Sequence, residues 1–264
     1  MLRKKLEELK NIFAEMEKAL IAYSGGIDST LVAKVAYDVL GDKALAITAV
    51  SPSLLPEDLE DARIQAAVIG ISHEEVKTHE MENQNYTSNP INRCYFCKSE
   101  LHDTLKPLAL KKGYSYVVDG VNAEDLRDYR PGIQAAKERG ARSPLAEVGM
   151  SKFEVRQLAK DLDLPWWDKP AQPCLSSRFP YGHEITSERL KMVEKAEEYL
   201  KECGLSEVRV RCQGSTARIE IPQNELKHFF DKYNFSELVQ YFSNLGFNCT
   251  SLDLEGLISG KLNR

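Results

Sequence analysis

Hydrophobic and polar positions change their period several times along the chain, and each period predicts one kind of element. Over residues 2–20 apolar side chains recur every three or four positions, which predicts an amphipathic helix. A short apolar run over residues 19–23 then ends in Ser-Gly-Gly, and a second helical face follows it. The same alternation continues with strands over 45–50, near 73–76 and over 116–119, and with helices over 57–69 and from beyond the Cys94-Cys97 pair to about 112. Strands that alternate with helices and are apolar on both faces predict an α/β fold, a mostly parallel sheet flanked by helices.

The pattern changes in the second half of the chain. Residues 121–150 are predicted to form a long loop with a short helix, and Ser151 with Glu154 forms a capping box that starts a helix over 151–162. Residues 169–182 hold three prolines and no periodicity, which is typical of a loop at a domain junction. Beyond it the order is helix, two strands, helix and strand, over 187–203, 208–212, 217–221, 225–245 and 249–254. We therefore expect an α/β domain over 1–182 and a smaller C-terminal α+β domain over 183–264.

Composition limits the classes of protein to which the chain can belong. Its 264 residues carry 35 Lys and Arg against 40 Asp and Glu, a formal net charge of -5. This acidic balance argues against a protein that coats nucleic acid, which needs a basic face. No apolar run approaches the roughly 18 residues that cross a bilayer, and acidic residues interrupt the apolar positions that a signal segment needs. We expect a cytosolic protein without a membrane span, whose six cysteines are reduced thiols.

A Ser-Gly-Gly-Ile-Asp-Ser hexapeptide stands where the first predicted strand passes into a helix. The N–H groups and the positive dipole end of a helix start bind anions. Gly25 and Gly26 would let an anion approach the backbone, and Ser24 and Ser29 would add hydroxyl donors, so we predict a loop that binds the pyrophosphate part of a nucleotide. Asp28 would repel phosphates unless a divalent cation bridges them, which predicts Mg2+. A turn that serves only tight packing of strand against helix is the alternative.

Three cysteines form the second candidate site. Cys94 and Cys97 make a C-x-x-C pair, and Cys174 lies in the predicted junction loop. Three thiolates can bind an iron-sulfur cluster and leave one iron without a protein ligand. Zinc, with His102 or His183 as the fourth ligand, and a redox dithiol without metal are equally compatible with the spacing.

The hexapeptide resembles the PP-loop of the ATP pyrophosphatase superfamily, and the whole chain resembles the LarE family of ATP-dependent sulfurtransferases. The segments that carry the resemblance are 24–29, 128–132, 140–143, 174–182, 208–211 and 217–220. Amide ligases and tRNA thiolases share the loop, whereas the later segments are specific to LarE. The resemblance implies cleavage of ATP to AMP and pyrophosphate, and synthesis of the thiocarboxylated pyridinium mononucleotide of the nickel-pincer cofactor. It also suggests a homo-oligomer.

The resemblance also implies a source of sulfur. LarE proteins divide into members with only the cysteine that matches Cys174, which gives up its own sulfur, and members with three cysteines that carry a [4Fe-4S] cluster. With Cys94, Cys97 and Cys174, this sequence is similar to the second group.

Four further residues are implied in substrate binding. Arg209 and Arg211 alternate along a predicted strand and share a face. The pattern by itself favours a solvated strand face, because half-exposed strands show such alternation; the resemblance implies that the two arginines contact a substrate phosphate. It further implies that Arg178 orients the substrate carboxylate or phosphate and that Glu220 lies near the substrate or a metal. An acid that the family has beyond Glu220 is replaced here around His228.

For several other polar residues and cysteines the sequence predicts a position in the fold but no function. Those that follow the predicted strand over 116–119 are expected near the site, because α/β sheets build sites at the carboxyl ends of their strands; they are Asn122, Glu124, Asp125, Asp128 and Arg130. Cys203, Cys212 and Cys249 lack metal-ligand spacing, and we expect them to pack in the core of the smaller domain.

These features predict an enzyme in which the loop, Asp28 and Mg2+ hold ATP while a substrate carboxylate is adenylated. Sulfur would then attack the acyl carbon, delivered from a sulfide donor on the open iron of a cluster held by Cys94, Cys97 and Cys174. If Cys174 gives its own sulfur instead, it becomes dehydroalanine and each protein acts once. The alternatives are a PP-loop tRNA thiolase, which would need a basic RNA surface, and a non-catalytic nucleotide-binding iron-sulfur sensor.

Overall fold

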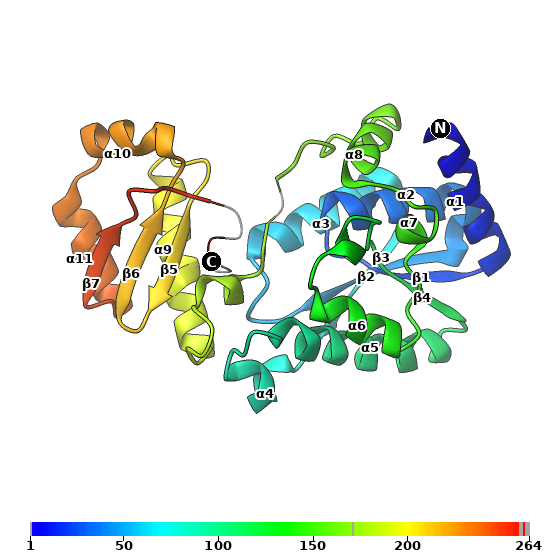
Figure 1. Cartoon of the computed structure of the whole chain (residues 1–264), viewed down its shortest axis with the longest axis horizontal. Helices are drawn as coiled ribbons and strands as arrows, with labels where there is room; N and C mark the ends of the chain where they lie inside the picture. The colour runs from blue at the N-terminus through cyan, green and yellow to red at the C-terminus, as the bar shows by residue number, and fades with distance from the viewer. Residues whose placement is uncertain (1, 171, 259–260, 262–264) are drawn as a thin grey trace. The chain divides into compact units, whose positions relative to one another are not determined.

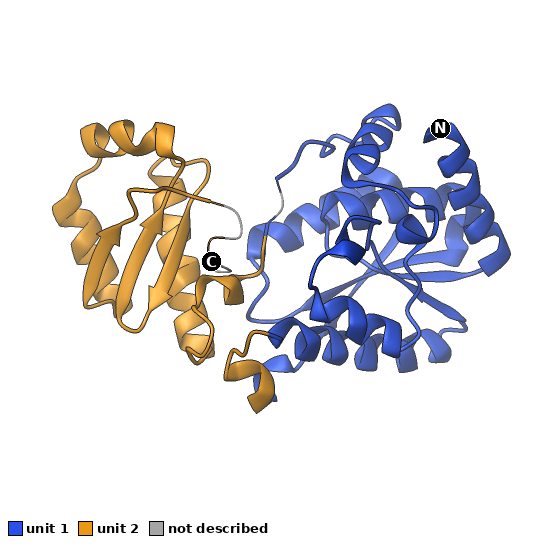
Figure 2. Ribbon diagram, viewed as in Figure 1, with its two compact units in different colours: residues 1–83, 92–172 blue, residues 84–91, 173–264 orange. Residues whose placement is uncertain are grey.

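A computed structural model describes residues 2–170, 172–258 and 261. The chain forms two compact units, residues 1–83 with 92–172 (unit 1) and residues 84–91 with 173–264 (unit 2), as Figure 2 shows. The junction lies before Pro173, earlier than the boundary expected after residue 182. The reason is that the junction loop bonds to the rest of unit 2: Tyr86 Oη lies 2.6 Å from Ser176 Oγ, and the amide of Gly182 donates to the carbonyl of Asn89 at 2.8 Å.

Unit 1 is built on a sheet of parallel strands in the order β3-β2-β1-β4. The strands are β1 (Ala19–Ala22), β2 (Ala44–Val50), β3 (Ser72–Lys77) and β4 (Tyr116–Val118). β1 pairs with β2 on one side and with β4 on the other, so the order of the chain reverses at β1. Crevices at the carboxyl ends of strands beside such a reversal are the usual ligand sites of open α/β sheets.

Helices cover both faces of this sheet (Figure 1). They are α1 (Leu2–Met16), α2 (Ile27–Leu40), α3 (Pro56–Ile69), α5 (Arg93–Lys111), α6 (Pro131–Glu138), α7 (Pro144–Glu147) and α8 (Lys152–Asp161). Successive residues of a strand point to opposite faces: Ile21 packs in the cluster formed with α1, α2, α3 and α8, whereas Leu20 packs against Leu105 of α5. The predicted α/β fold is confirmed.

Three local expectations for unit 1 need correction. The helix expected over residues 2–20 ends at Met16, and Leu20 lies in β1. The helix expected after the C-x-x-C pair already begins at Arg93, so both cysteines lie in its first turns. The region 121–150 contains two short helices, α6 and α7, each with a proline at its start, where the missing N–H costs nothing.

Unit 2 has the predicted mixed α+β order. Its elements are α4 (Gln84–Thr87), α9 (Ser187–Glu202), β5 (Arg209–Gln213), β6 (Thr216–Glu220), α10 (Leu226–Lys232), α11 (Phe235–Leu245) and β7 (Cys249–Leu252). β5 and β6 are antiparallel, and β7 joins β6 in parallel. The helix expected over 225–245 is divided in two, because the Asn234 side chain accepts the amide of Ser236 at 3.1 Å and caps a new helix there. Among the helices of the described chain, none is long and apolar enough to cross a membrane.

Candidate active site

The loop between β1 and α2 leaves donors open at the start of a helix. Gly26 precedes α2, and within the described chain no side chain caps its first turn. Gly25 adopts a φ of +70°, and a Cβ at that position would lie 3.0 Å from Cβ of Ala62, so a larger residue would be both strained and crowded. Uncapped N–H groups and the dipole of a helix start are features that suit an anion.

The two serines of the loop mainly shape it. Ser29 is buried; its hydroxyl donates to the Gly26 carbonyl at 2.9 Å and accepts the amide of Ser24 at 3.2 Å. The Ser24 hydroxyl lies 3.1 Å from the Ser29 hydroxyl, and Ser24 is exposed. Ser24 is therefore the hydroxyl that faces outward, while Ser29 holds the loop closed.

A buried polar cluster supports the loop from behind, and no pattern in the sequence had indicated it. The hydroxyls of Tyr23 and Thr30 donate to Oε1 of Gln65 at 3.4 and 2.7 Å, and Gln65 is fully buried on α3. Burial raises the pKa of Tyr23 to about 12, so the phenol remains neutral. The cluster ties the end of β1 and the first turn of α2 to α3.

Asp28 carries the negative charge of the loop and already has a cationic partner. Its carboxylate forms an ion pair with Lys152 and accepts Nδ2 of Asn122 at 3.2 Å. Lys152 is the first residue of α8, and the predicted capping box of Ser151 with Glu154 fixes the start of that helix. The sequence did not indicate Lys152 as a site residue, because nothing in the spacing of the chain shows that α8 begins beside α2.

The segment after β4 packs closely against the same loop. A Cβ on Gly120 would lie 2.6 Å from the amide nitrogen of Ser29, so only glycine fits without displacing the backbone. Asp119, just before it, accepts the Ser143 hydroxyl at 2.7 Å, and burial raises the pKa of this carboxyl. The polar residues after β4 were expected near the loop, and Asn122 reaches it directly by donating a hydrogen bond to Asp28.

The remaining polar residues of this segment bond among themselves. Asn122 Oδ1 accepts the amides of Glu124 and Asp125 at 2.9 and 3.2 Å, and Arg130 forms ion pairs with Asp125 and Asp128 at 2.8 and 3.5 Å. These contacts close the turn that presents Asn122 to Asp28.

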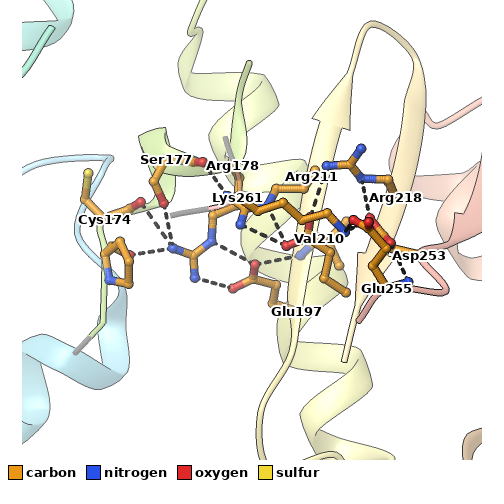
Figure 3. A network of polar contacts seen from close by, with 12 residues as sticks. Cys174, Ser177, Arg178, Glu197, Val210, Arg211, Arg218, Asp253, Glu255 and Lys261 are labelled. Atoms are coloured by element: carbon orange, nitrogen blue, oxygen red, sulfur yellow. Dashed lines mark hydrogen bonds and ion pairs between the residues drawn. The ribbon is translucent and has the colours of Figure 1, made fainter. Parts of the chain in front are cut away.

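In unit 2, Arg178 and Glu197 form a buried bidentate ion pair (Figure 3). Nε and Nη2 of Arg178 each lie 2.9 Å from a carboxylate oxygen of Glu197, and both side chains are 1% exposed. Nη1 of Arg178 donates to the carbonyls of Pro173 and Cys174, the latter at 3.2 Å. In this structure Arg178, which we expect to orient the substrate, holds the backbone that carries Cys174.

Arg211 and Glu220 form a second buried pair beside it. Nη2 of Arg211 lies 2.8 Å from Glu220, and its Nη1 donates to the carbonyl of Ser177 at 2.6 Å. Glu220 is fully buried and also pairs with Arg218 at 3.0 Å. In this structure Arg211 and Glu220 therefore bond to other groups of the protein. The contacts to substrate or metal that we expected for them stay a prediction.

Arg209 differs from these arginines. It is half-buried, and although its backbone pairs with Glu220 in the sheet, its guanidinium makes no hydrogen bond or ion pair with another described residue. Burial lowers the pKa of its guanidinium, and the nearby charges of Arg178 and Arg211 lower it further. A guanidinium without a partner beside two others favours an anion.

Comparison with known proteins decides the family of this chain. It is 37% identical over 253 residues to the pyridinium-3,5-bisthiocarboxylic acid mononucleotide synthase of Lactiplantibacillus plantarum, covering 94% of this chain and 90% of that protein. The chain belongs to the LarE family. The resemblance inferred from its motifs is thus confirmed, and this LarE protein is an ATP-dependent sulfurtransferase.

Other relatives extend over the same length. The LarE chain is 67% identical over 264 residues to an uncharacterized protein of Synechocystis sp., covering 100% of this chain and 98% of that protein. It is 32% identical over 255 residues to an uncharacterized protein of Methanocaldococcus jannaschii, covering 96% of each. The family model described as NAD synthase matches residues 2–93, which include the loop after β1.

The cysteines of this LarE protein lie in different surroundings. Cys94 is exposed and Cys97 half-buried, three residues apart in the first turns of α5 and therefore on one side of the helix. Cys174 is exposed and belongs to unit 2, whereas the pair belongs to unit 1. None of the six cysteines forms a disulfide. Within the described residues of each unit, no three His, Cys, Asp or Glu side chains are placed to bind a metal.

The other cysteines and the candidate histidines differ in burial. Cys212 is buried as expected and Cys203 is half-buried, but Cys249 is exposed at the start of the edge strand β7, so its predicted place in the core is wrong. His102 is buried on α5, and burial together with the charge of Lys98 lowers its pKa to about 4, which keeps its imidazole neutral. His183 and His228 are exposed.

Proposed function

We propose that this LarE protein uses ATP to adenylate a carboxylate of pyridinium-3,5-biscarboxylic acid mononucleotide and then replaces a carboxylate oxygen with sulfur. The observation that carries the proposal is its relationship, over nearly the whole chain, to a synthase named for the corresponding bisthiocarboxylic acid. The open helix start after β1 and the half-buried Arg209 support it, because they are suited to the two phosphate-bearing molecules that such a reaction needs.

ATP would bind with its phosphates on the loop of Ser24, Gly25, Gly26, Asp28 and Ser29. Asp28 suits a Mg2+ site, since Mg2+ is usually held by one or two carboxylates together with substrate phosphates; the ion would offset the charge between Asp28 and ATP. Lys152 neutralises Asp28 in the structure and is near enough to the loop to share that task with the phosphates. Adenylation itself then depends on positioning and electrostatics.

The reaction has two steps. An oxygen of the substrate carboxylate attacks the α-phosphorus, the bond to the bridging oxygen breaks, and pyrophosphate leaves. Sulfur then attacks the acyl carbon, and AMP departs with the original oxygen. Arg209 would hold the phosphate of the mononucleotide, and Cys174 would take part in the delivery of sulfur.

For the sulfur we propose a [4Fe-4S] cluster held by Cys94, Cys97 and Cys174. The donor set fits, because thiolates are the ligands of such clusters and the three thiols are wholly or partly accessible. With three protein ligands the cluster would leave one iron open to a sulfide donor. The chain itself would contribute the thiolates, the fixed spacing on α5 and the ordered loop at Cys174.

Release of pyrophosphate tests the first step. We expect release only when ATP and the pyridinium biscarboxylate mononucleotide are both present, with a thiocarboxylate as product. Binding of ATP without release would indicate a sensor, and release that depends on tRNA instead would indicate a thiolase; either outcome would overturn the proposal.

Iron and acid-labile sulfide analysis of anaerobically reconstituted protein tests the sulfur source. We expect about four irons per chain, lost in Cys97→Ala and retained in Cys249→Ala, whose thiol is exposed on another element. Absence of iron would contradict the cluster and favour Cys174 as donor. In that case, mass spectrometry after turnover would show that Cys174 has lost the elements of hydrogen sulfide and become dehydroalanine.

A further inference from the structure

The backbone of Cys174 is held by a chain of buried charged groups, shown in Figure 3. Nη1 of Arg178 donates to the carbonyl oxygens of Pro173 and Cys174, which precede and follow the α-carbon of Cys174. The Cys174 carbonyl also accepts the amide of Ser177 at 2.9 Å and so closes a turn. The position of the thiol therefore depends on where Arg178 lies.

Glu197 fixes Arg178. Its two oxygens take Nε and Nη2 of Arg178 at 2.9 Å each, which locks the plane of the guanidinium. With Nη1 committed to the loop carbonyls and the side chain 1% exposed, Arg178 has no face open to a substrate.

The same carboxylate reaches the strand of Arg209. Oε1 of Glu197 accepts the amide of Val210 at 2.8 Å, and Val210 stands between Arg209 and Arg211 on β5. β5 is the edge of its sheet, so its outward N–H groups need partners from elsewhere. One buried carboxylate thus joins the loop of Cys174 to the strand that presents the unpartnered arginine.

We propose that Glu197 is a positioning residue: through Arg178 and Val210 it sets the distance and orientation of Cys174 relative to a substrate phosphate on Arg209. The inference rests on the proposed function. A displacement of about 1 Å in a reacting group can cost about 100-fold in rate, so this link would affect sulfur transfer and leave adenylation, which takes place on the loop after β1, unchanged.

Glu197→Gln tests the inference, since it keeps the size of the side chain and removes the charge that orients Arg178. We expect pyrophosphate release and the KM for the mononucleotide to stay within about threefold of wild type, and thiocarboxylate formation to fall about 100-fold. Hydrogen exchange, followed by mass spectrometry, should become faster at the amides of residues 175–179. The matched control is Lys261→Met, which breaks ion pairs to Asp253 and Glu255 in the same unit without touching the loop.

Equal loss of pyrophosphate and thiocarboxylate, or no loss of thiocarboxylate, would overturn the inference, as would unchanged exchange at 175–179. If wild type releases no pyrophosphate, the proposed function fails, and the exchange measurement still decides whether Glu197 orders the loop. Should Glu197→Gln not fold, Arg178→Lys serves the same purpose, because an ammonium keeps the charge but cannot bond Glu197 and both carbonyls at once.

Discussion

The loop after β1 and the arginine cluster of unit 2 were both predicted to bind phosphate, and they use their polar groups in opposite ways. In the loop, Ser24 and Gly26 are exposed and the first turn of α2 lacks a cap. In the cluster, Arg178, Arg211 and Glu220 are at most 3% exposed and are bonded to other groups of the same unit. Residue type indicates the chemistry that a group can perform, but burial and existing partners decide whether it is available. By that measure Arg209 is the arginine of the cluster that is open to a ligand.

The largest expected difference between a bonded and an open arginine is that between Arg211→Gln and Arg209→Gln, compared in unfolding free energy and in substrate affinity. Among the described residues, Arg211→Gln leaves the fully buried Glu220 with Arg218 as its remaining ionic partner, and breaking such a buried pair costs about 3 kcal/mol of unfolding free energy. Arg209→Gln removes a partly desolvated charge repelled by its neighbours, so stability should change by less than about 0.5 kcal/mol, while affinity for the mononucleotide falls. Urea unfolding measures the first effect and substrate titration the second; equal destabilisation by both changes would break the comparison.

The unfolding free energies of the two units should also depend differently on pH in acid, because unit 2 buries ion pairs whereas unit 1 buries a neutral imidazole. The pKa of His102 falls from 6.5 to about 4 on folding. Between these values the unfolded chain binds more protons, so unfolding free energy drops as pH falls from 6.5 to 4, by about 3 kcal/mol, and this contribution is flat above 6.5. His102→Gln should lose this part of the pH dependence in urea unfolding. His183→Gln, at an exposed histidine, is the control and should keep it.

Substitution of Lys152 tests whether the charged groups at the loop after β1 are available to ATP. If its ammonium serves ATP, Lys152→Met should slow pyrophosphate release about 100-fold, the scale of losing one preorganised charge. Lys5→Met removes the ion pair of Lys5 with Glu154 at the same end of α8, 2.6 Å long, and should leave release nearly unchanged. Similar rates in the two variants would show that Lys152 only stabilises the fold.

The smallest predicted effect comes from removing the N-cap of one helix in each unit. Ser151→Ala and Thr186→Ala each remove the N-cap of a helix, α8 in unit 1 and α9 in unit 2, and each should cost about 1 kcal/mol. Only Ser151→Ala should raise the KM for ATP, because α8 begins with Lys152. Matching KM values would contradict the placement of Lys152 by its cap.

The sequence predicted the parts of this molecule that depend on neighbours along the chain. The strand, turn and helix around Gly25, the capping box at Ser151 and the alternation of Arg209 with Arg211 are all local patterns. It did not predict the ion pair of Asp28 with Lys152 or that of Arg178 with Glu197, because tertiary packing chooses those partners. A buried glutamate inside α9 has no sequence signal that distinguishes it from a solvated one.

The measurement that tests the account most directly is single-turnover kinetics of Cys174→Ala with ATP and the pyridinium biscarboxylate mononucleotide. Pyrophosphate and thiocarboxylate should be followed separately. The account predicts pyrophosphate release at close to the wild-type rate, because the loop after β1 is intact, and no thiocarboxylate. Thiocarboxylate formed at the wild-type rate, or loss of pyrophosphate release together with sulfur transfer, would contradict it.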